Sequence, residues 1–269
     1  MNNRQYAPMN TRVESGIQGQ LSACLHLFGI SARRLFWSRQ TIICVMMLGF
    51  SAIVVVAWST GHERSSQDFI EQVFLVFFVS FLLPIFSLAY GSAGIASDRE
   101  EQTLVYLLVS PLPRPMIFLT KCGASMLLAL VWTIGGMSVM CLLAGQAGRD
   151  AWPVLLPAIV WSTVAYVALF LLFSVTFRRA TTVALIYAVF VETLVGNMPG
   201  IAKRLAVSFY TRCLIFDAGS VFGVTPSGPV NPNLFVAMPG PLAQTVIIVI
   251  AGGLLLAGML IFSLREYSR

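Results

Sequence analysis

Few side chains of this sequence have the types and spacing that acid–base, nucleophilic or metal chemistry requires. The two histidines, His26 and His62, are far apart, and one chain cannot build a histidine-based catalytic group or metal cluster from them. The five cysteines are scattered without C-x-x-C spacing, which indicates neither a disulfide framework nor a zinc site. The sequence has no G-x-S-x-G motif and no P-loop. We therefore expect no catalytic or metal-binding residues, no cofactor of its own and no P-loop ATP hydrolysis, which disfavours an intramembrane enzyme.

One charged stretch does have a pattern, SDREEQTLVYLLVSPLPRP at residues 97–115. Ser97 and Glu100 have the spacing of a capping box, in which each side chain satisfies a backbone N–H of the other residue. The acidic residues Asp98, Glu100 and Glu101 suit the positive end of a helix dipole. The pattern predicts a helix that starts at Ser97.

An apolar face continues this predicted helix. Leu104, Leu107 and Leu108 follow the i, i+3, i+4 spacing of a helix face, and the prolines after them end the helix in an extended turn. The segment 97–110 is either an amphipathic linker that covers the membrane surface or a docking element for a partner. We favour docking. A flexible polar loop would be enough to join the two long apolar stretches on either side, so a helix with an apolar face indicates a further role.

The rest of the chain is strongly apolar, and its long apolar runs place the charged stretch beside a membrane. The sequence has 269 residues, of which 57% are hydrophobic and only 10% are charged, and its mean hydropathy is +0.83. Several apolar runs approach or exceed the roughly 20 residues that cross a hydrocarbon core. The expected fold is an all-α polytopic membrane protein with six transmembrane helices. The predicted spans are 41–58, 69–95, 123–144, 153–177, 180–196 and 242–264.

The basic residues predict the orientation of these spans. If the N-terminus is cytoplasmic, twelve of the 17 Lys and Arg residues lie on the inner side and five on the outer side. Such a bias is typical of cytoplasmic loops, so we expect a multi-pass protein of the cytoplasmic (inner) membrane with both termini inside. The basic residues that set this orientation also account for the net charge of +6. We do not expect nucleic-acid binding, because the sequence lacks a basic run with interleaved aromatic residues.

Two segments outside the spans have their own pattern. Residues 1–40 are expected to form a cytoplasmic N-terminus with an amphipathic interface helix, and residues 41–269 the six-span transmembrane domain. Helical spacing on one face supports the interface helix, although a simple extension of the first span is the alternative. Its members are Ile17, Leu21, Cys24, Leu25, Phe28, Ala32, Leu35 and Phe36. The long outer loop 197–241 is expected to contain one or two short re-entrant helices before the last span.

An acidic residue, Glu192, falls near the outer end of the fifth predicted span. It could face a translocation path or bind a cation, because acidic residues within spans are often functional. Alternatively, it lies at the outer interface near Lys203 or Arg204. We favour the structural role.

The charged stretch and the residues after it resemble the cytoplasmic signature of the type-two ATP-binding-cassette (ABC) permeases. That signature is roughly acid-x-acid-x-G-T-L, a leucine-rich turn, P-x-x-R and a later Lys. The sequence departs from it at Gln102, where the family usually has glycine. The matching residues are Asp98, Glu100, Thr103, Leu104, Leu107, Leu108, Pro111, Arg114 and Lys121.

The resemblance implies the membrane subunit of an ABC transporter, mostly of the exporting kind. Two six-span halves, either two copies or one copy with a paralogue, would form the pathway, and separate ATPase subunits would supply ATP hydrolysis. The matching residues, with Glu101, would form the coupling helix that docks the ATPase. A non-transporting membrane scaffold that anchors a cytoplasmic partner is the alternative function.

Overall fold

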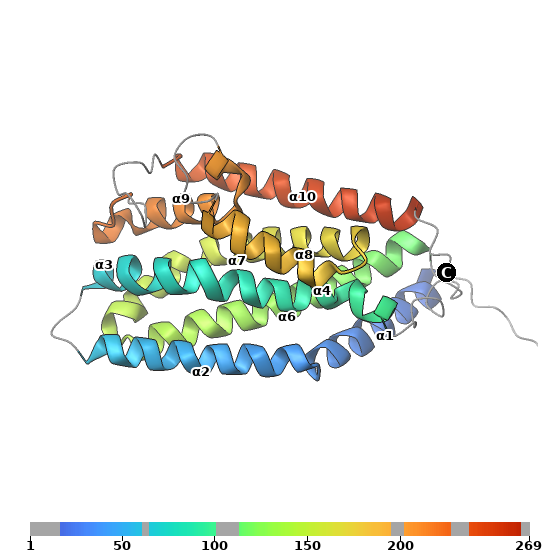
Figure 1. Cartoon of the computed structure of the whole chain (residues 1–269), viewed down its shortest axis with the longest axis horizontal. Coiled ribbons are helices and arrows are strands. Elements are labelled where there is room, and N and C mark those ends of the chain that lie inside the picture. Colours follow the sequence, from blue (N-terminus) through green and yellow to red (C-terminus); the bar gives the residue numbers. More distant parts are fainter. Residues whose placement is uncertain (1–16, 61–64, 101–112, 195–201, 227–236, 265–269) are drawn as a thin grey trace, which may run out of the picture.

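The computed structural model describes residues 17–60, 65–100, 113–194, 202–226 and 237–264, and throughout these ranges the chain forms helices and short connections (Figure 1). No strand occurs in them. The elements are α1 (Ile17–Phe36), α2 (Arg39–Ser59), α3 (Ser66–Asp68), the π-helix η1 (Phe69–Leu82), α4 (Leu83–Glu100), α6 (Arg114–Leu143), α7 (Gln146–Thr176), α8 (Ala180–Ile186), the π-helix η2 (Tyr187–Leu194), the 3-10 helix η4 (Ala202–Leu205), α9 (Val207–Gly219), the 3-10 helix η5 (Ser220–Phe222) and α10 (Gly240–Leu264).

Within the described residues, five helices are long and apolar enough to cross a membrane, which confirms the predicted all-α polytopic class. They are α2, the continuous rod from Ser66 to Ala96, α6, α7 and α10. For the fifth predicted span, the described helices α8 and η2 together cover residues 180–194. At ~1.5 Å per residue they reach about 22 Å, which is less than the ~30 Å of a hydrocarbon core. The predicted count of six full spans is therefore not confirmed.

Two spans begin earlier than the sequence predicts. Helix α6 begins at Arg114, nine residues before the predicted start, since Pro113 occupies the N-cap and Pro115 lies in the first turn. Proline is well tolerated there because the first helical N–H groups have no intrahelical partner. Helix α7 begins at Gln146, directly after a tight turn in which Gly145 has a φ of 73°, a value that favours glycine.

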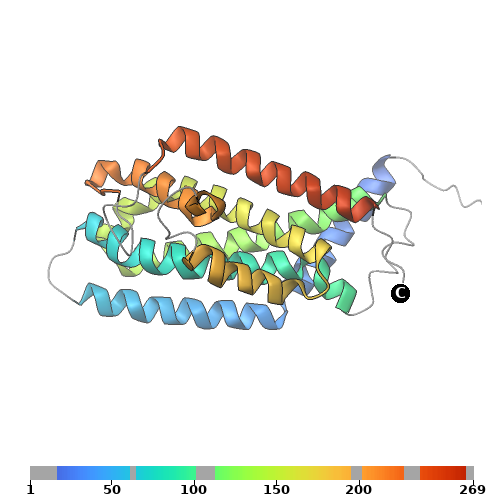
Figure 2. The ribbon, with the colours of Figure 1, turned by 45° about the horizontal axis from the view of Figure 1, so that its top comes forward.

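The helices form a bundle in which α4 and α7 lie at the centre, with α2 and α10 on opposite flanks (Figures 1 and 2). In the rod that includes α4, and in α7, 67% of the residues of the most apolar stretch are buried, against 17% in α2 and 22% in α10. The flanking helices direct large apolar side chains such as Ile42, Ile53 and Val249 outward. Such surfaces suit a lipid environment.

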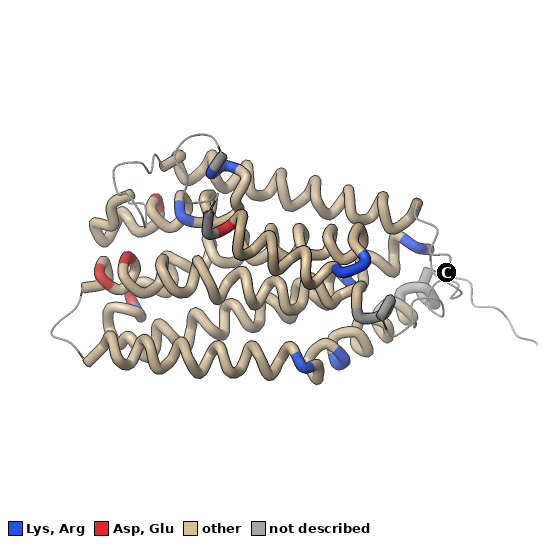
Figure 3. Tube along the Cα trace, in the orientation of Figure 1, with Lys and Arg blue, Asp and Glu red and all other residues tan. Residues whose placement is uncertain are grey.

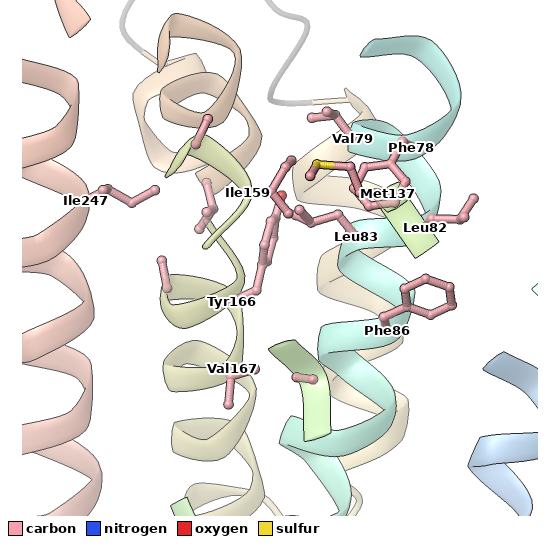
Figure 4. Close-up of a cluster of buried hydrophobic side chains, with 14 of the residues drawn as sticks. Phe78, Val79, Leu82, Leu83, Phe86, Met137, Ile159, Tyr166, Val167 and Ile247 are labelled. Atoms are coloured by element: carbon pink, nitrogen blue, oxygen red, sulfur yellow. The ribbon is translucent and has the colours of Figure 1, made fainter. Parts of the chain in front are cut away.

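The core lies where η1, α4, α6 and α7 meet, with α10 closing one side (Figure 4). Phe78 and Val79 from η1 point toward Met137 of α6 and Ile159 of α7 in the close-up. All four side chains are fully buried. Packing of this density transmits displacement of one helix to its neighbours, because interiors have few voids.

Charge is distributed unevenly along the bundle (Figure 3). The end that carries the α1–α2 and α7–α8 junctions holds only basic residues among the charged side chains that the structure describes. We call it the basic end, and its members are Arg33, Arg34, Arg39, Arg114, Lys121, Arg178 and Arg179. The described acidic residues lie at the opposite end, which we call the acidic end, apart from one part way along the bundle.

Candidate functional site

Helix α4 leads from the buried core of the bundle into the charged stretch. Residues 97–100 form its last turn and continue it without interruption. The predicted helix start and capping box at Ser97 are therefore wrong, because Ser97 lies within a helix that began at Leu83. The side chains of Asp98 and Glu100 are outside the described part of the structure.

The remaining residues of the predicted coupling helix lie mostly outside the described residues. They are Glu101, Thr103, Leu104, Leu107, Leu108 and Pro111. The two described members belong to α6 rather than to a loop. Arg114 is exposed in the first turn, and its Nη1 donates a hydrogen bond of 3.4 Å to the carbonyl oxygen of Ser263 near the end of α10. Lys121 is only 4% exposed.

Small residues allow α4 to approach its neighbours closely. A Cβ atom added at Gly91 would lie 2.9 Å from Cβ of Phe170 in α7. One added at Gly94 would overlap the hydroxyl of Ser125 in α6. Ser92 is fully buried and accepts a hydrogen bond of 3.5 Å from Thr181 of α8. A displacement of α4 at these positions is therefore passed on to α6 and α7, because their atoms are already in close contact.

The junction of α1 and α2 is also joined to α4. The hydroxyl of Thr41 lies 3.1 Å from the Tyr90 hydroxyl and forms a hydrogen bond with it. Tyr90 is fully buried, and Thr41 also interacts with the carbonyl oxygen of Leu35 at the end of α1. The N-terminal helix, the first span and α4 thus form one connected unit at the basic end.

A second site lies around Glu192, which is 3% exposed. Its carboxylate accepts hydrogen bonds from the backbone N–H groups of Val207 (3.1 Å) and Ser208 (3.0 Å). These are the first two residues of α9, whose N-terminal N–H groups have no partner within the helix. Glu192 therefore caps α9 and places a negative charge at the positive end of its dipole.

Helix α9 is held deep in the bundle by polar side chains. Its residues from Val207 to Phe216 are all buried. Thr211 donates to Ser162 of α7 at 2.8 Å, and Arg212 donates to Ser80 of η1 at 3.2 Å. The expected short helix before the last span is therefore present, and it contacts α7, η1 and α10.

Arg212 was absent from the predicted site. In the sequence it is one of three basic residues in an outer loop, but in the structure it is 5% exposed. Its guanidinium group and the hydroxyls of Tyr166 and Tyr187 interact electrostatically with the Glu192 carboxylate. The spacing of Glu192 and Arg212 gives no local signal for this, because the contact depends on how the loop between them folds back.

Nothing in the described part of the chain gathers three or more His, Cys, Asp or Glu side chains in one place. The arrangement instead defines a helical membrane protein in which the buried helix α4 runs up to the charged stretch of the sequence. Residues 32–215, more than half of the chain, match a family described as "ABC-2 family transporter protein". A comparison with curated proteins finds none that matches the chain.

The chain therefore belongs to the ABC-2 transporter family, as the resemblance of its charged stretch predicted. It is a permease-type membrane component of an ABC transporter and a multi-pass membrane protein. Membership implies association with an ABC ATPase subunit in general.

Proposed function

We propose that this chain is the permease subunit of an ABC exporter of the cytoplasmic membrane, with both termini and residues 97–115 on the cytoplasmic side. A separate ATPase docks on Asp98, Glu100, Glu101, Thr103, Leu104, Leu107, Leu108, Pro111 and Arg114, whereas Lys121, which is only 4% exposed, is left out of this surface. A second copy or a paralogue completes the pathway. ATP is bound and hydrolysed by the partner, and this chain holds no cofactor.

One observation carries the proposal. Helix α4 runs without a break from the buried centre of the bundle to Glu100, where the segment with the family's signature follows. A force applied to this segment acts directly on the most buried helix pair, α4 and α7. ATP can shift the equilibrium between two conformations of the permease only if ATP binding favours one of them. An ATPase that docks on the segment after α4 would transmit this preference to the permease.

The basic end supports the orientation. Seven arginine and lysine side chains gather there, and the described acidic side chains lie elsewhere (Figure 3). Positive residues accumulate on the cytoplasmic side of membrane proteins. Helix α4 reaches Glu100 at this end of the bundle, so we expect the signature segment to be accessible to an ATPase of the cytoplasm.

The test is co-expression with a P-loop ATPase encoded beside this chain, followed by purification and an ATPase assay in lipid. We expect co-purification, ATP hydrolysis, and an ATP-dependent change in the protease sensitivity of the permease. The scaffold alternative predicts co-purification without that change. Failure to co-purify with any P-loop ATPase encoded beside the gene would contradict the docking proposal.

A further inference from the structure

The short helix η4 lies part way along the bundle. The Tyr187 hydroxyl donates a hydrogen bond of 3.4 Å to the carbonyl oxygen of Leu205 in η4, and Glu192 caps α9, which follows η4. Tyr187 and Glu192 lie seven and twelve residues after Ala180, where α8 begins at the basic end. Helices α8 and η2 run along the bundle (Figure 1). At ~1.5 Å per residue, η4 is therefore level with a point about 10–18 Å from the start of α8, inside a hydrocarbon core of ~30 Å.

The two basic residues of η4 have different surroundings. Lys203 is buried, and its Nζ lies 5.3 Å from the centre of the Phe209 ring. Arg204 is exposed, and the hydroxyl of Tyr210 is an electrostatic neighbour of its guanidinium group. Residues 195–201, which precede η4 in the chain, contain no charged residue. Arg204 thus places a cation on the surface of the bundle, at a level that lies within the hydrocarbon core.

An exposed arginine at this depth restricts what can lie against it. Charged side chains within a membrane are costly in lipid, and they almost always face the interior of a bundle or a water-filled cavity. Arg204 is exposed and does not face the interior of this bundle. The face that carries Arg204 therefore suits a water-filled space rather than lipid. The pathway between two permease halves, which the proposed function requires, is such a space.

The face beside Arg204 is otherwise apolar. Leu205, the next residue, is 70% exposed. Along α8 and η2, which the hydrogen bond of Tyr187 joins to η4, exposed apolar side chains recur every four residues. These side chains, each 52–56% exposed, are Leu185, Ile186, Val189 and Phe190. Ligand sites commonly combine apolar walls with a few polar groups that fix the orientation of the ligand. One cation beside a row of apolar side chains complements an anion that carries hydrocarbon.

We propose that the face formed by Arg204, Leu205 and the apolar row on α8 and η2 lines the transport pathway and binds an amphiphilic anion. The acidic group of this anion contacts Arg204, and its hydrocarbon part covers the apolar row. A guanidinium group forms two parallel hydrogen bonds with a phosphate or a carboxylate, so either can be the acidic group. The inference rests on the proposed function, which supplies the second half that encloses the pathway.

The first test measures whether this face contacts water. It uses the whole chain in lipid nanodiscs, with its five cysteines replaced by alanine. A cysteine introduced at Leu205, or at Phe190 on the same face, should react with a membrane-impermeant methanethiosulfonate. A cysteine at Val249 is the matched control, because Val249 is 67% exposed on the lipid-facing helix α10, about 14 Å from its start. It should react about tenfold more slowly, since the reactive thiolate is disfavoured in lipid.

The second test measures how well an anion protects Leu205→Cys from this reagent. Dodecyl phosphate should slow the labelling, whereas dodecyltrimethylammonium and inorganic phosphate at the same concentration should not. R204Q should weaken the apparent affinity for dodecyl phosphate on the order of fivefold, as for the loss of one basic residue near an anionic group, and R204K should retain most of it. R149Q is the matched control, an exposed arginine in the first turn of α7, and should leave protection unchanged.

Slow labelling at both Leu205 and Phe190, equal protection by the anionic and the cationic probe, or unchanged protection in R204Q would overturn the proposal. Equal protection by inorganic phosphate would also overturn it, because the site would then bind a free anion. Neither test requires the ATPase. If both tests succeed and no ATPase co-purifies, the anion site stands and the proposed transport function fails. If the ATPase co-purifies and neither cysteine reacts, only this inference fails.

Discussion

The carboxylate of Glu192 accepts a hydrogen bond of 3.0 Å from the backbone N–H of Ser208, sixteen residues further along the chain. This bond joins the end of the short helix pair α8 and η2 to the start of α9. Neither α8 with η2 nor α9 is long enough to cross a membrane alone. The hydrogen bonds of Glu192 therefore hold the two short helical segments together, as a continuous backbone does within a single long helix.

Replacing Glu192 with glutamine should destabilise α9, because the amide has one acceptor oxygen and no charge for two helix N–H groups. We expect a loss of about 1–2 kcal/mol in the free energy of unfolding, as for other helix caps. The measurement is unfolding in mixed micelles. Asp150→Asn is the matched control, since Asp150 is exposed at the acidic end, and it should change stability by less than about 0.5 kcal/mol. Equal effects of the two changes would contradict the capping role.

Arg212 and Glu192 should be energetically coupled. Arg212→Met removes the hydrogen bond to Ser80 and leaves the Glu192 charge less compensated, at a cost of about 2 kcal/mol. The double variant E192Q/R212M should cost less than the sum of the single changes by about 1 kcal/mol, because each side chain is part of the other's environment. A double-mutant cycle of unfolding free energies measures this difference. Strict additivity would show that the two groups act independently.

Close packing of α4 predicts that Gly94→Val is strongly unfavourable. The added side chain meets Ser125 and Leu171, so the helices must separate, at a cost of about 1–3 kcal/mol. Gly135→Val on α6 is the control, because nothing lies within 4 Å of its added Cβ. Thermal unfolding in detergent should show a lower midpoint for Gly94→Val alone. If Gly94→Val left the midpoint unchanged, α4 would not be tightly packed at this position.

The class and the family could both be predicted from the sequence. Hydropathy and length give the all-α membrane class, and the charged stretch gives the family, which the match over residues 32–215 confirms. Helix boundaries were less predictable. The local pattern of Ser97 and Glu100 also fits the interior of a helix, and only the continuous packing of α4 shows that no helix starts there.

The site around Glu192 was beyond sequence reasoning. The hydropathy of residues 180–196 resembles that of a full span, and the described helices α8 and η2 cover residues 180–194 of it. Whether an acidic residue is exposed or caps a distant helix depends on contacts between residues far apart in the sequence. Hydropathy and local spacing do not predict such contacts. The buried position of Arg212 follows from the same fold and has no local signal.

The orientation can be measured by cysteine labelling. In a cysteine-free variant, a cysteine at Val221, which is 81% exposed near the acidic end, should react with a membrane-impermeant maleimide in intact cells. A cysteine at Arg179, exposed at the basic end, should react only after the membrane is permeabilised. The reverse pattern would place residues 97–115 outside and invert the proposed topology.

The central claim is that the segment after α4 docks the ATPase. The most direct test alters residues of this segment and measures the ATPase activity of the permease–ATPase complex in lipid. Glu100→Arg and Leu107→Asp should abolish the response of the ATPase to the permease, because each removes a contact proposed for docking. Asp150→Arg and Val221→Asp introduce the same residues at the opposite end and should leave the response intact. Full coupling of ATPase activity and transport in both Glu100→Arg and Leu107→Asp would contradict the account.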